Sequence, residues 1–238
     1  MYRIESKVVG SRTDTNGELK LTGALDYLQD CSLQWMESEQ SFSKYLSKNN
    51  AGMFLVFRQV DVIRMPRYRE EITTQTSIFD CKNAFGLRNT NIYDTKKRPC
   101  ILSWSIGAFV NLKTGKMIRL TPEEIKKVKY DEKAEMEYLN RKIDVPENNH
   151  WENMEKVVVK RSDIDLYHHM NNTKYIDIAH EYIPYNSSVK RLRVAFKKPA
   201  LLGDEIFPRV INLSNKYYVE LRDRENRQNA IIEFTVYR

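Results

Sequence analysis

Apolar and polar positions alternate in two successive sets of segments, and each set predicts a helix together with several strands. Residues 2 to 12 alternate as a strand does, and the polar stretch between Gly10 and Gly17 is typical of a turn. From Thr22 the apolar positions recur at a helical period over about 25 residues without proline. Alternating segments then predict strands at residues 53–66, 71–80, 84–94 and 100–112, and Lys113 to Gly115 predicts a hairpin turn.

The pattern is interrupted after residue 120 and then returns. Residues 121–142 predict a polar helix, and the sequence PENNH at 146–150 predicts an irregular connection. Beyond it we expect a strand at 157–163, a helix at 171–183, and strands at 191–199, 204–213, 216–223 and 229–238. We therefore predict an N-terminal module at residues 1–125, a linker at 126–152 and a C-terminal module at 153–238.

Fixed offsets along the chain indicate an internal repeat. An offset of 151 residues sets Asp14 on Asp165, Leu25 on Ile176 and Asp26 on Asp177, and an offset of 133 sets Pro66 on Pro199. Both copies then have a strand, a turn that begins with aspartate, a helix, and a strand that ends near proline. Two copies of one module are the simplest explanation.

The two turns differ in their chemistry. The first turn, DTNGELKLTG from Asp14, contains no histidine, whereas the second, SDIDLYHHMNNTKY from Ser162, combines aspartates, histidines and asparagines at a predicted helix N-terminus. Helix N-terminal amides stabilise an oxyanion, and an adjacent carboxylate and imidazole supply a general base. Thioester hydrolysis needs this set of groups, and we expect no cofactor.

Structural roles are the alternative for several of these residues. Either Asn171 or Asn172 can cap the helix, Asp163 suits a turn, and Tyr175 suits the buried face of the helix. His168 and its neighbour His169 lack a Cys or His cluster that would complete a metal site, so we expect no bound metal.

Composition and charge exclude several classes of protein. The net charge is +7, but the basic residues are scattered among 32 acidic ones without a nucleic-acid motif, so we expect no nucleic-acid partner. The three cysteines indicate a reducing compartment, and neither a signal peptide nor a membrane span is predicted, which favours a cytoplasmic protein without a membrane contact. A basic excess also suits an acidic protein partner. Candidate contacts are Lys126, Lys127, Lys156, Lys160, Arg161, Lys197 and Lys198.

The run DIDLYHHMNNTKY, from Asp163 to Tyr175, resembles the hot-dog thioesterase motif D-x-D-x-x-x-H-V-N-N-x-x-Y. Together with the tandem arrangement, it makes the whole chain similar to the acyl-[acyl carrier protein] thioesterases of plants and bacteria. The resemblance implies an α+β double hot-dog fold, in which each module is a long helix wrapped by an antiparallel sheet. It also implies hydrolysis of fatty acyl-acyl carrier protein, with release of the free fatty acid and an end to chain elongation.

The resemblance assigns roles to residues of the second module. Asp165 and His169 match the residues that orient and activate the attacking water, and Asn172 matches the second motif asparagine. Tyr167 stands where plant members have an asparagine that positions water or substrate. Ala195 stands where plant members have a glutamate.

No acidic residue lies between Val189 and Gly203, so the base is either the Asp165 and His169 pair or Glu181 from the helix. The first module is expected to hold the acyl tail. Its candidate contacts are Trp35, Met36, Met53 and Phe54.

Two other functions stay open. An acyl-coenzyme A thioesterase has the same fold and chemistry, and a non-catalytic acyl-binding or dehydratase-like hot-dog protein fits the departures at Tyr167 and Ala195. The expected oligomeric state is a monomer or a homodimer, because two modules in one chain already supply the pairing that single modules obtain by dimerising.

Overall fold

The computed structural model describes residues 1–147 and 149–237, apart from the side chain of Ser41. These residues fall into two compact units. The first unit comprises residues 1–56 and 60–138, and the second comprises residues 57–59 and the chain from residue 139. The division between residues 138 and 139 falls inside the predicted linker.

The predicted long helix of the first unit is present but broken. α1 spans Leu21–Ser38 and α2 spans Gln40–Lys48. Glu39 separates the two helices because its φ of −87° and ψ of 78° lie outside the helical region. The buried side chains of α1 recur every three or four residues and form the stripe that packs on the sheet. They include Leu21, Ala24, Leu25, Leu28 and Cys31.

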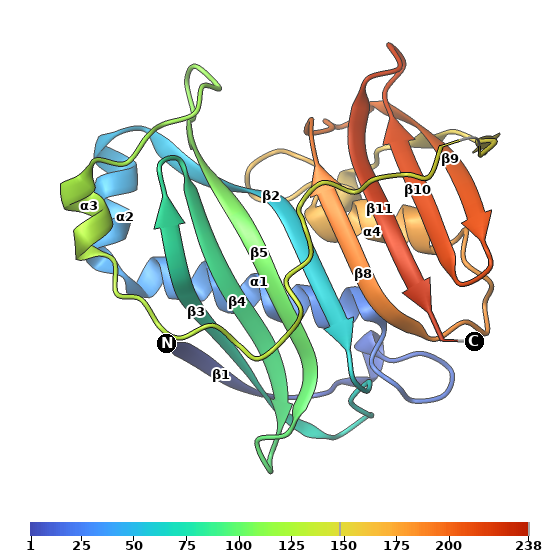
Figure 1. Cartoon of the computed structure of the whole chain (residues 1–238), viewed down its shortest axis with the longest axis horizontal. Helices are drawn as coiled ribbons and strands as arrows, with labels where there is room; N and C mark the ends of the chain where they lie inside the picture. Colours follow the sequence, from blue (N-terminus) through green and yellow to red (C-terminus); the bar gives the residue numbers. More distant parts are fainter. Residues whose placement is uncertain (148, 238) are drawn as a thin grey trace. The chain divides into compact units, whose positions relative to one another are not determined.

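The sheet of the first unit has the strand order β1-β3-β4-β5-β2. Its strands are β1 (Tyr2–Lys7), β2 (Ala51–Val62), β3 (Glu71–Lys82), β4 (Phe85–Asp94) and β5 (Pro99–Asn111). The β1–β3, β3–β4 and β4–β5 pairs are antiparallel, and α1 runs across one face of this sheet (Figure 1). The predicted strand at residues 2–12 is therefore too long, because residues 10–12 form a 3-10 turn.

The second unit repeats this plan with a shorter helix. α4 (Asn172–His180) lies against a sheet of order β8-β11-β10-β9 (Figure 1). Its strands are β8 (Val189–Phe196), β9 (Glu205–Leu213), β10 (Lys216–Arg222) and β11 (Gln228–Val236), and the short β6 (Glu152–Asn153) and β7 (Val157–Val158) pair with β9. The predicted strand at 157–163 is thus reduced to two residues, followed by a 3-10 turn at 161–163. Arg238, the last residue of the predicted final strand, lies outside the described residues.

Backbone hydrogen bonds confirm the internal repeat and correct its second offset. The 3-10 turns at residues 10–12 and 161–163 are 151 residues apart, as predicted. The Leu19 amide donates to the Pro66 carbonyl at 2.8 Å, and the Met170 amide donates to the Ala200 carbonyl at 2.8 Å. Pro66 therefore corresponds to Ala200, at an offset of 134 rather than 133.

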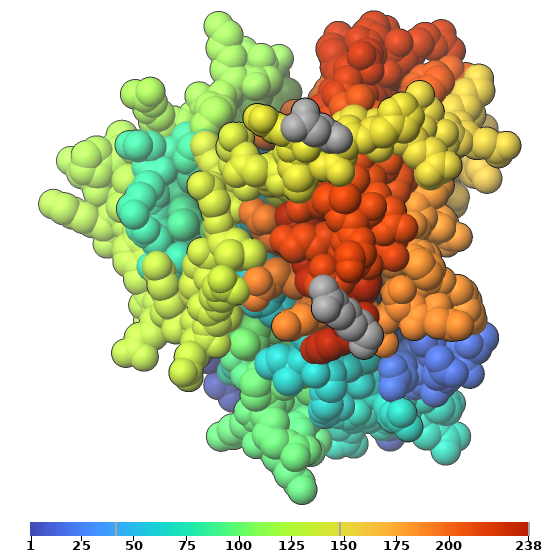
Figure 2. Space-filling view, turned by 45° about the vertical axis from the view of Figure 1, so that its right-hand side comes forward, coloured from blue at the N-terminus to red at the C-terminus, as the bar shows by residue number. Residues whose placement is uncertain are grey.

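The connection between the copies has little regular structure. The predicted helix at 121–142 is confined to α3 (Pro122–Lys127), which has a capping box between Thr121 and Glu124. Beyond residue 139 the chain crosses the strands of the second unit, as the yellow segment shows in Figures 1 and 2. Arg193 on β8 holds it there, because its guanidinium donates to the Asn140 and Lys142 carbonyls and pairs with Glu233 at 3.1 Å.

Candidate active site

The turn at Asp165 to His169 is held by the Asp165 side chain and by the backbone. Asp165 Oδ1 accepts hydrogen bonds from the Tyr167 amide at 2.8 Å and the His169 amide at 3.3 Å. The Asp165 amide donates to the His169 carbonyl at 2.8 Å. The second carboxylate oxygen, Oδ2, accepts no hydrogen bond within the described part of the chain. One oxygen thus builds the turn and the other is available for chemistry.

The first unit contains the same turn without histidine. Asp14 Oδ1 accepts from the Asn16 and Glu18 amides, both at 2.9 Å, and the Asp14 amide donates to the Glu18 carbonyl at 2.8 Å. Gly17 has a φ of 73°, and its counterpart His168 has a φ of 63°. The turn is therefore a property of the fold, and what distinguishes the second copy is the histidine at position 169 and the tyrosine at position 167.

The start of α4 lies directly after this turn. Asn171 is the N-cap, since its Oδ1 accepts from the Thr173 amide at 3.0 Å and from the Thr173 hydroxyl at 2.7 Å. The Met170 and Asn171 amides donate to the Ala200 and Asp163 carbonyls. Among the first amides of this helix, the Asn172 N–H has no acceptor within the described residues. It is the donor that a developing oxyanion can use.

Tyr175 fixes the neighbouring loop and belongs to the core, as expected. Its hydroxyl accepts a hydrogen bond from the Ala200 amide at 2.8 Å, and its ring meets Phe196 edge-on at 5.6 Å. Burial raises the pKa of the Tyr175 phenol to about 12, so it stays protonated. Asp163 is also structural, because its carboxylate accepts from the Lys160 amide at 2.7 Å.

The predicted catalytic side chains differ in their exposure. His169 and Asn172 are half-buried, whereas Tyr167 is 45% exposed. His180 is the last residue of α4, and its ring centroid lies 5.9 Å from that of Phe234. Burial lowers the pKa of His180. In the described residues, no group of three or more His, Cys, Asp or Glu side chains is arranged to hold a metal ion.

The position that corresponds to the plant glutamate holds an alanine in the structure. Ala195 is buried in β8, opposite Ile231 of β11. Glu181 follows the last residue of α4, which places it roughly 13 Å along the helix axis from the turn. At this distance Glu181 does not reach the turn, so Asp165 and His169 are the candidates for the base.

The residues predicted to contact the acyl tail all belong to the first unit. Trp35, on α1, carries the Arg88 guanidinium over its ring at 4.3 Å. Met53 packs beside a glycine pair, Gly86 and Gly107, which face each other across β4 and β5. A Cβ added at Gly107 would lie 2.8 Å from the Met53 sulfur, so the methionine fills the space that the glycine leaves. Met36 and Phe54 are both half-buried.

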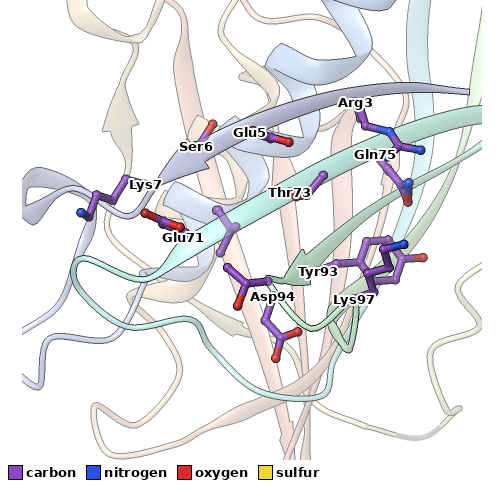
Figure 3. Close-up of a pocket in the computed structure, with 12 residues that line it drawn as sticks. Arg3, Glu5, Ser6, Lys7, Glu71, Thr73, Gln75, Tyr93, Asp94 and Lys97 are labelled. Atoms are coloured by element: carbon purple, nitrogen blue, oxygen red, sulfur yellow. The ribbon is translucent and has the colours of Figure 1, made fainter.

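The first unit also has a groove of about 850 Å³ along β1, β3 and the end of β4 (Figure 3). Charged side chains of both signs line it, among them Arg3, Lys7, Glu71 and Asp94. An acyl tail requires an apolar lining, so this groove is not the acyl site. The three cysteines provide no chemistry either, because all are buried and unpaired, and burial raises the pKa of each thiol to about 11 or 12.

Comparisons with known proteins agree with this architecture. Residues 1–128 match the model of the acyl-ACP thioesterase N-terminal domain, and residues 146–235 match that of the C-terminal domain. The structure of an acyl-ACP thioesterase from Bacteroides thetaiotaomicron superposes with a TM-score of 0.87 at 22% identity, covering 99% of this chain and 97% of that one. The 12:0-ACP thioesterase from Umbellularia californica gives 0.82 at 14% identity, covering 99% and 96%.

A MaoC-like dehydratase from Phytophthora capsici is less similar, with a TM-score of 0.56 at 15% identity, covering 78% of this chain and 72% of that one. Comparison with curated protein sequences finds no match. The repeated helix and antiparallel sheet define a double hot-dog fold, which confirms the predicted fold class. The chain belongs to the acyl-ACP thioesterase family and is a thioester hydrolase. Within the described residues, no helix is long and apolar enough to span a membrane.

Proposed function

We propose that the second unit hydrolyses fatty acyl-acyl carrier protein at the turn formed by Asp165 and His169. The observation that carries this proposal is the comparison of the two turns. Both have the same backbone hydrogen bonds, but only the second places an imidazole, that of His169, four residues after the aspartate. The first turn has the same backbone structure without this imidazole, so the fold does not require His169.

The reaction follows from these groups. Asp165, assisted by His169, takes a proton from water as the water oxygen bonds to the thioester carbonyl carbon. The N–H of Asn172 stabilises the resulting oxyanion. The carbon–sulfur bond then breaks, the carrier thiol leaves with a proton, and the free fatty acid remains. Tyr167 belongs to the same turn, and in this proposal its phenol orients water or substrate.

The first unit holds the acyl tail in this proposal. Met53 and Phe54 of β2 and Trp35 and Met36 of α1 supply apolar surface. Trp35 lies 5.8 Å from Phe42, which lies 5.8 Å from Phe109, so aromatic rings continue from the helix to the sheet. The protein acts in the cytoplasm as a monomer or homodimer, without a metal or a cofactor.

Competition between two thioesters tests whether the protein prefers an acyl chain on carrier protein or on coenzyme A. Acyl-carrier protein and acyl-coenzyme A of the same chain length are mixed with the full chain, and free fatty acid and both thiols are quantified. Faster release from the carrier protein is expected. Faster release from coenzyme A would make the protein an acyl-coenzyme A thioesterase, and acyl binding without release of either thiol would contradict catalysis.

A further inference from the structure

Three leucine side chains are exposed around the catalytic turn of the second unit. Leu166 lies within the turn and is 70% exposed, and Leu201 and Leu202 are 49% and 56% exposed. Backbone hydrogen bonds bring their segments together: Met170 donates to Ala200 at 2.8 Å, and Gly203 donates to the Val159 carbonyl at 3.0 Å. We call these three leucines the leucine patch.

Cations lie in the segments that bear the leucine patch. Lys160 and Arg161 follow Val159, Lys197 precedes the loop of Leu201, and all three side chains are exposed. Within the described residues, no carboxylate lies within ion-pair distance of these cations. Two other basic residues that the sequence suggested are neutralised, since Lys156 pairs with Glu205 and Lys198 with Asp223, both at 2.6 Å.

The nearby acids are directed into the backbone. Asp163 accepts from the Lys160 amide, Asp165 from the turn amides, and Asp204 from the Leu201 amide at 2.9 Å. These carboxylates accept backbone hydrogen bonds and form no ion pair with Lys160, Arg161 or Lys197, so the three cations stay available to an acidic partner.

The first unit provides an internal comparison. At the positions that correspond to the three leucines and three cations, it has Val9, Gly10, Thr15, Ile63, Arg67 and Tyr68. Arg67 is the one cation of this set, and it pairs with Glu18 at 3.1 Å. Val9, Ile63 and Tyr68 are also exposed, so exposed apolar surface is common to both copies and the unpaired cations are what the second copy adds. These cations are found in the copy that has His169.

We propose that the leucine patch with Lys160, Arg161 and Lys197 is the docking surface for the carrier protein, which would present acidic and apolar side chains on one amphipathic segment. The leucines bury apolar area in the complex and the cations accelerate encounter. This inference rests on the proposed function, because the surface adjoins the turn that would receive the thioester.

The test compares two substrates that share an acyl chain but differ in the carrier. Acyl-carrier protein can reach the docking surface, whereas acyl-pantetheine is too small to cover it and has no charge. The triple variant Lys160→Glu, Arg161→Glu, Lys197→Glu is measured beside a matched control with the same change of charge in the first unit, Lys113→Glu, Lys116→Glu, Arg119→Glu, whose side chains are exposed in the segment after β5.

In the triple variant we expect kcat/KM for acyl-carrier protein to fall by at least about 10-fold at low salt, with a smaller dependence on ionic strength. Its kcat/KM for acyl-pantetheine should stay within twofold, which also reports an intact fold. The control should retain both activities.

Unchanged kinetics with acyl-carrier protein would overturn the docking surface, as would an equal loss with both substrates or an equal loss in the control. A wild-type protein that hydrolyses neither substrate would instead overturn the proposed function itself. A variant Leu201→Ser, Leu202→Ser removes two of the three leucines without changing the charge, and it should raise KM for acyl-carrier protein without changing the rate with acyl-pantetheine.

Discussion

The substitution Asp165→Asn separates the structural role of this aspartate from its chemical role. Asparagine retains an Oδ1 acceptor for the Tyr167 and His169 amides, so the two hydrogen bonds that build the turn are kept. Each of these hydrogen bonds contributes about 0.5–1.5 kcal/mol to stability. Because both are kept, the free energy of unfolding should fall by less than about 1 kcal/mol. Losing the base should lower kcat by about 100-fold to 10,000-fold.

Asp14→Asn in the first unit is the matched control. Its Oδ1 accepts from two amides at 2.9 Å in the same turn, so the change in stability should be similar and the activity should not change. Urea denaturation gives the stability, and thiol release from acyl-carrier protein gives kcat. The reasoning is refuted if Asp165→Asn stays within threefold of wild type, or if Asp14→Asn loses as much activity.

Three further predictions address the fold and the acyl site. His168→Gly should raise the free energy of unfolding by up to about 1 kcal/mol in urea, because the residue has a φ of 63°; a loss of stability would contradict this. Arg58 is 5% exposed, its Nε makes no hydrogen bond within the described residues, and burial lowers its pKa to about 10. The residue at the corresponding position of the second copy is the buried Leu192. Arg58→Leu should stabilise the protein by about 1–4 kcal/mol in the same assay, and destabilisation would refute the inference. Met53→Ala should shift the optimum of kcat/KM toward longer acyl chains, because its sulfur fills the space beside Gly107; an unchanged optimum would exclude this role.

Periodicity predicted the main elements because their buried faces repeat locally. The stripe on α1 and the alternation of the strands are visible without knowledge of the partners. The break at Glu39 was not visible, because no proline or glycine marks it. The helix predicted at 121–142 was too long, since a polar segment with suitable composition does not extend as a helix unless it has a face to bury, and α3 ends at Lys127.

The residue types of the candidate catalytic turn are visible in the sequence, whereas its hydrogen bonds required the structure. The sequence left open whether Asn171 or Asn172 caps the helix, and the contact with Thr173 decides for Asn171. The one-residue error in the second offset arose because proline was used as the marker, whereas the backbone pairs Pro66 with the position of Ala200. Hydrogen bonds between residues far apart in the chain decide which positions of the two copies correspond, and these bonds cannot be deduced from one sequence.

The most direct test of the central claim compares two adjacent histidines. Thiol release from acyl-carrier protein is measured for His169→Ala and for His168→Ala, whose side chain is exposed in the same turn. The account predicts a loss of at least about 100-fold for His169→Ala and a change within threefold for His168→Ala. Equal losses, or activity that depends on His168 alone, would contradict hydrolysis at Asp165 and His169.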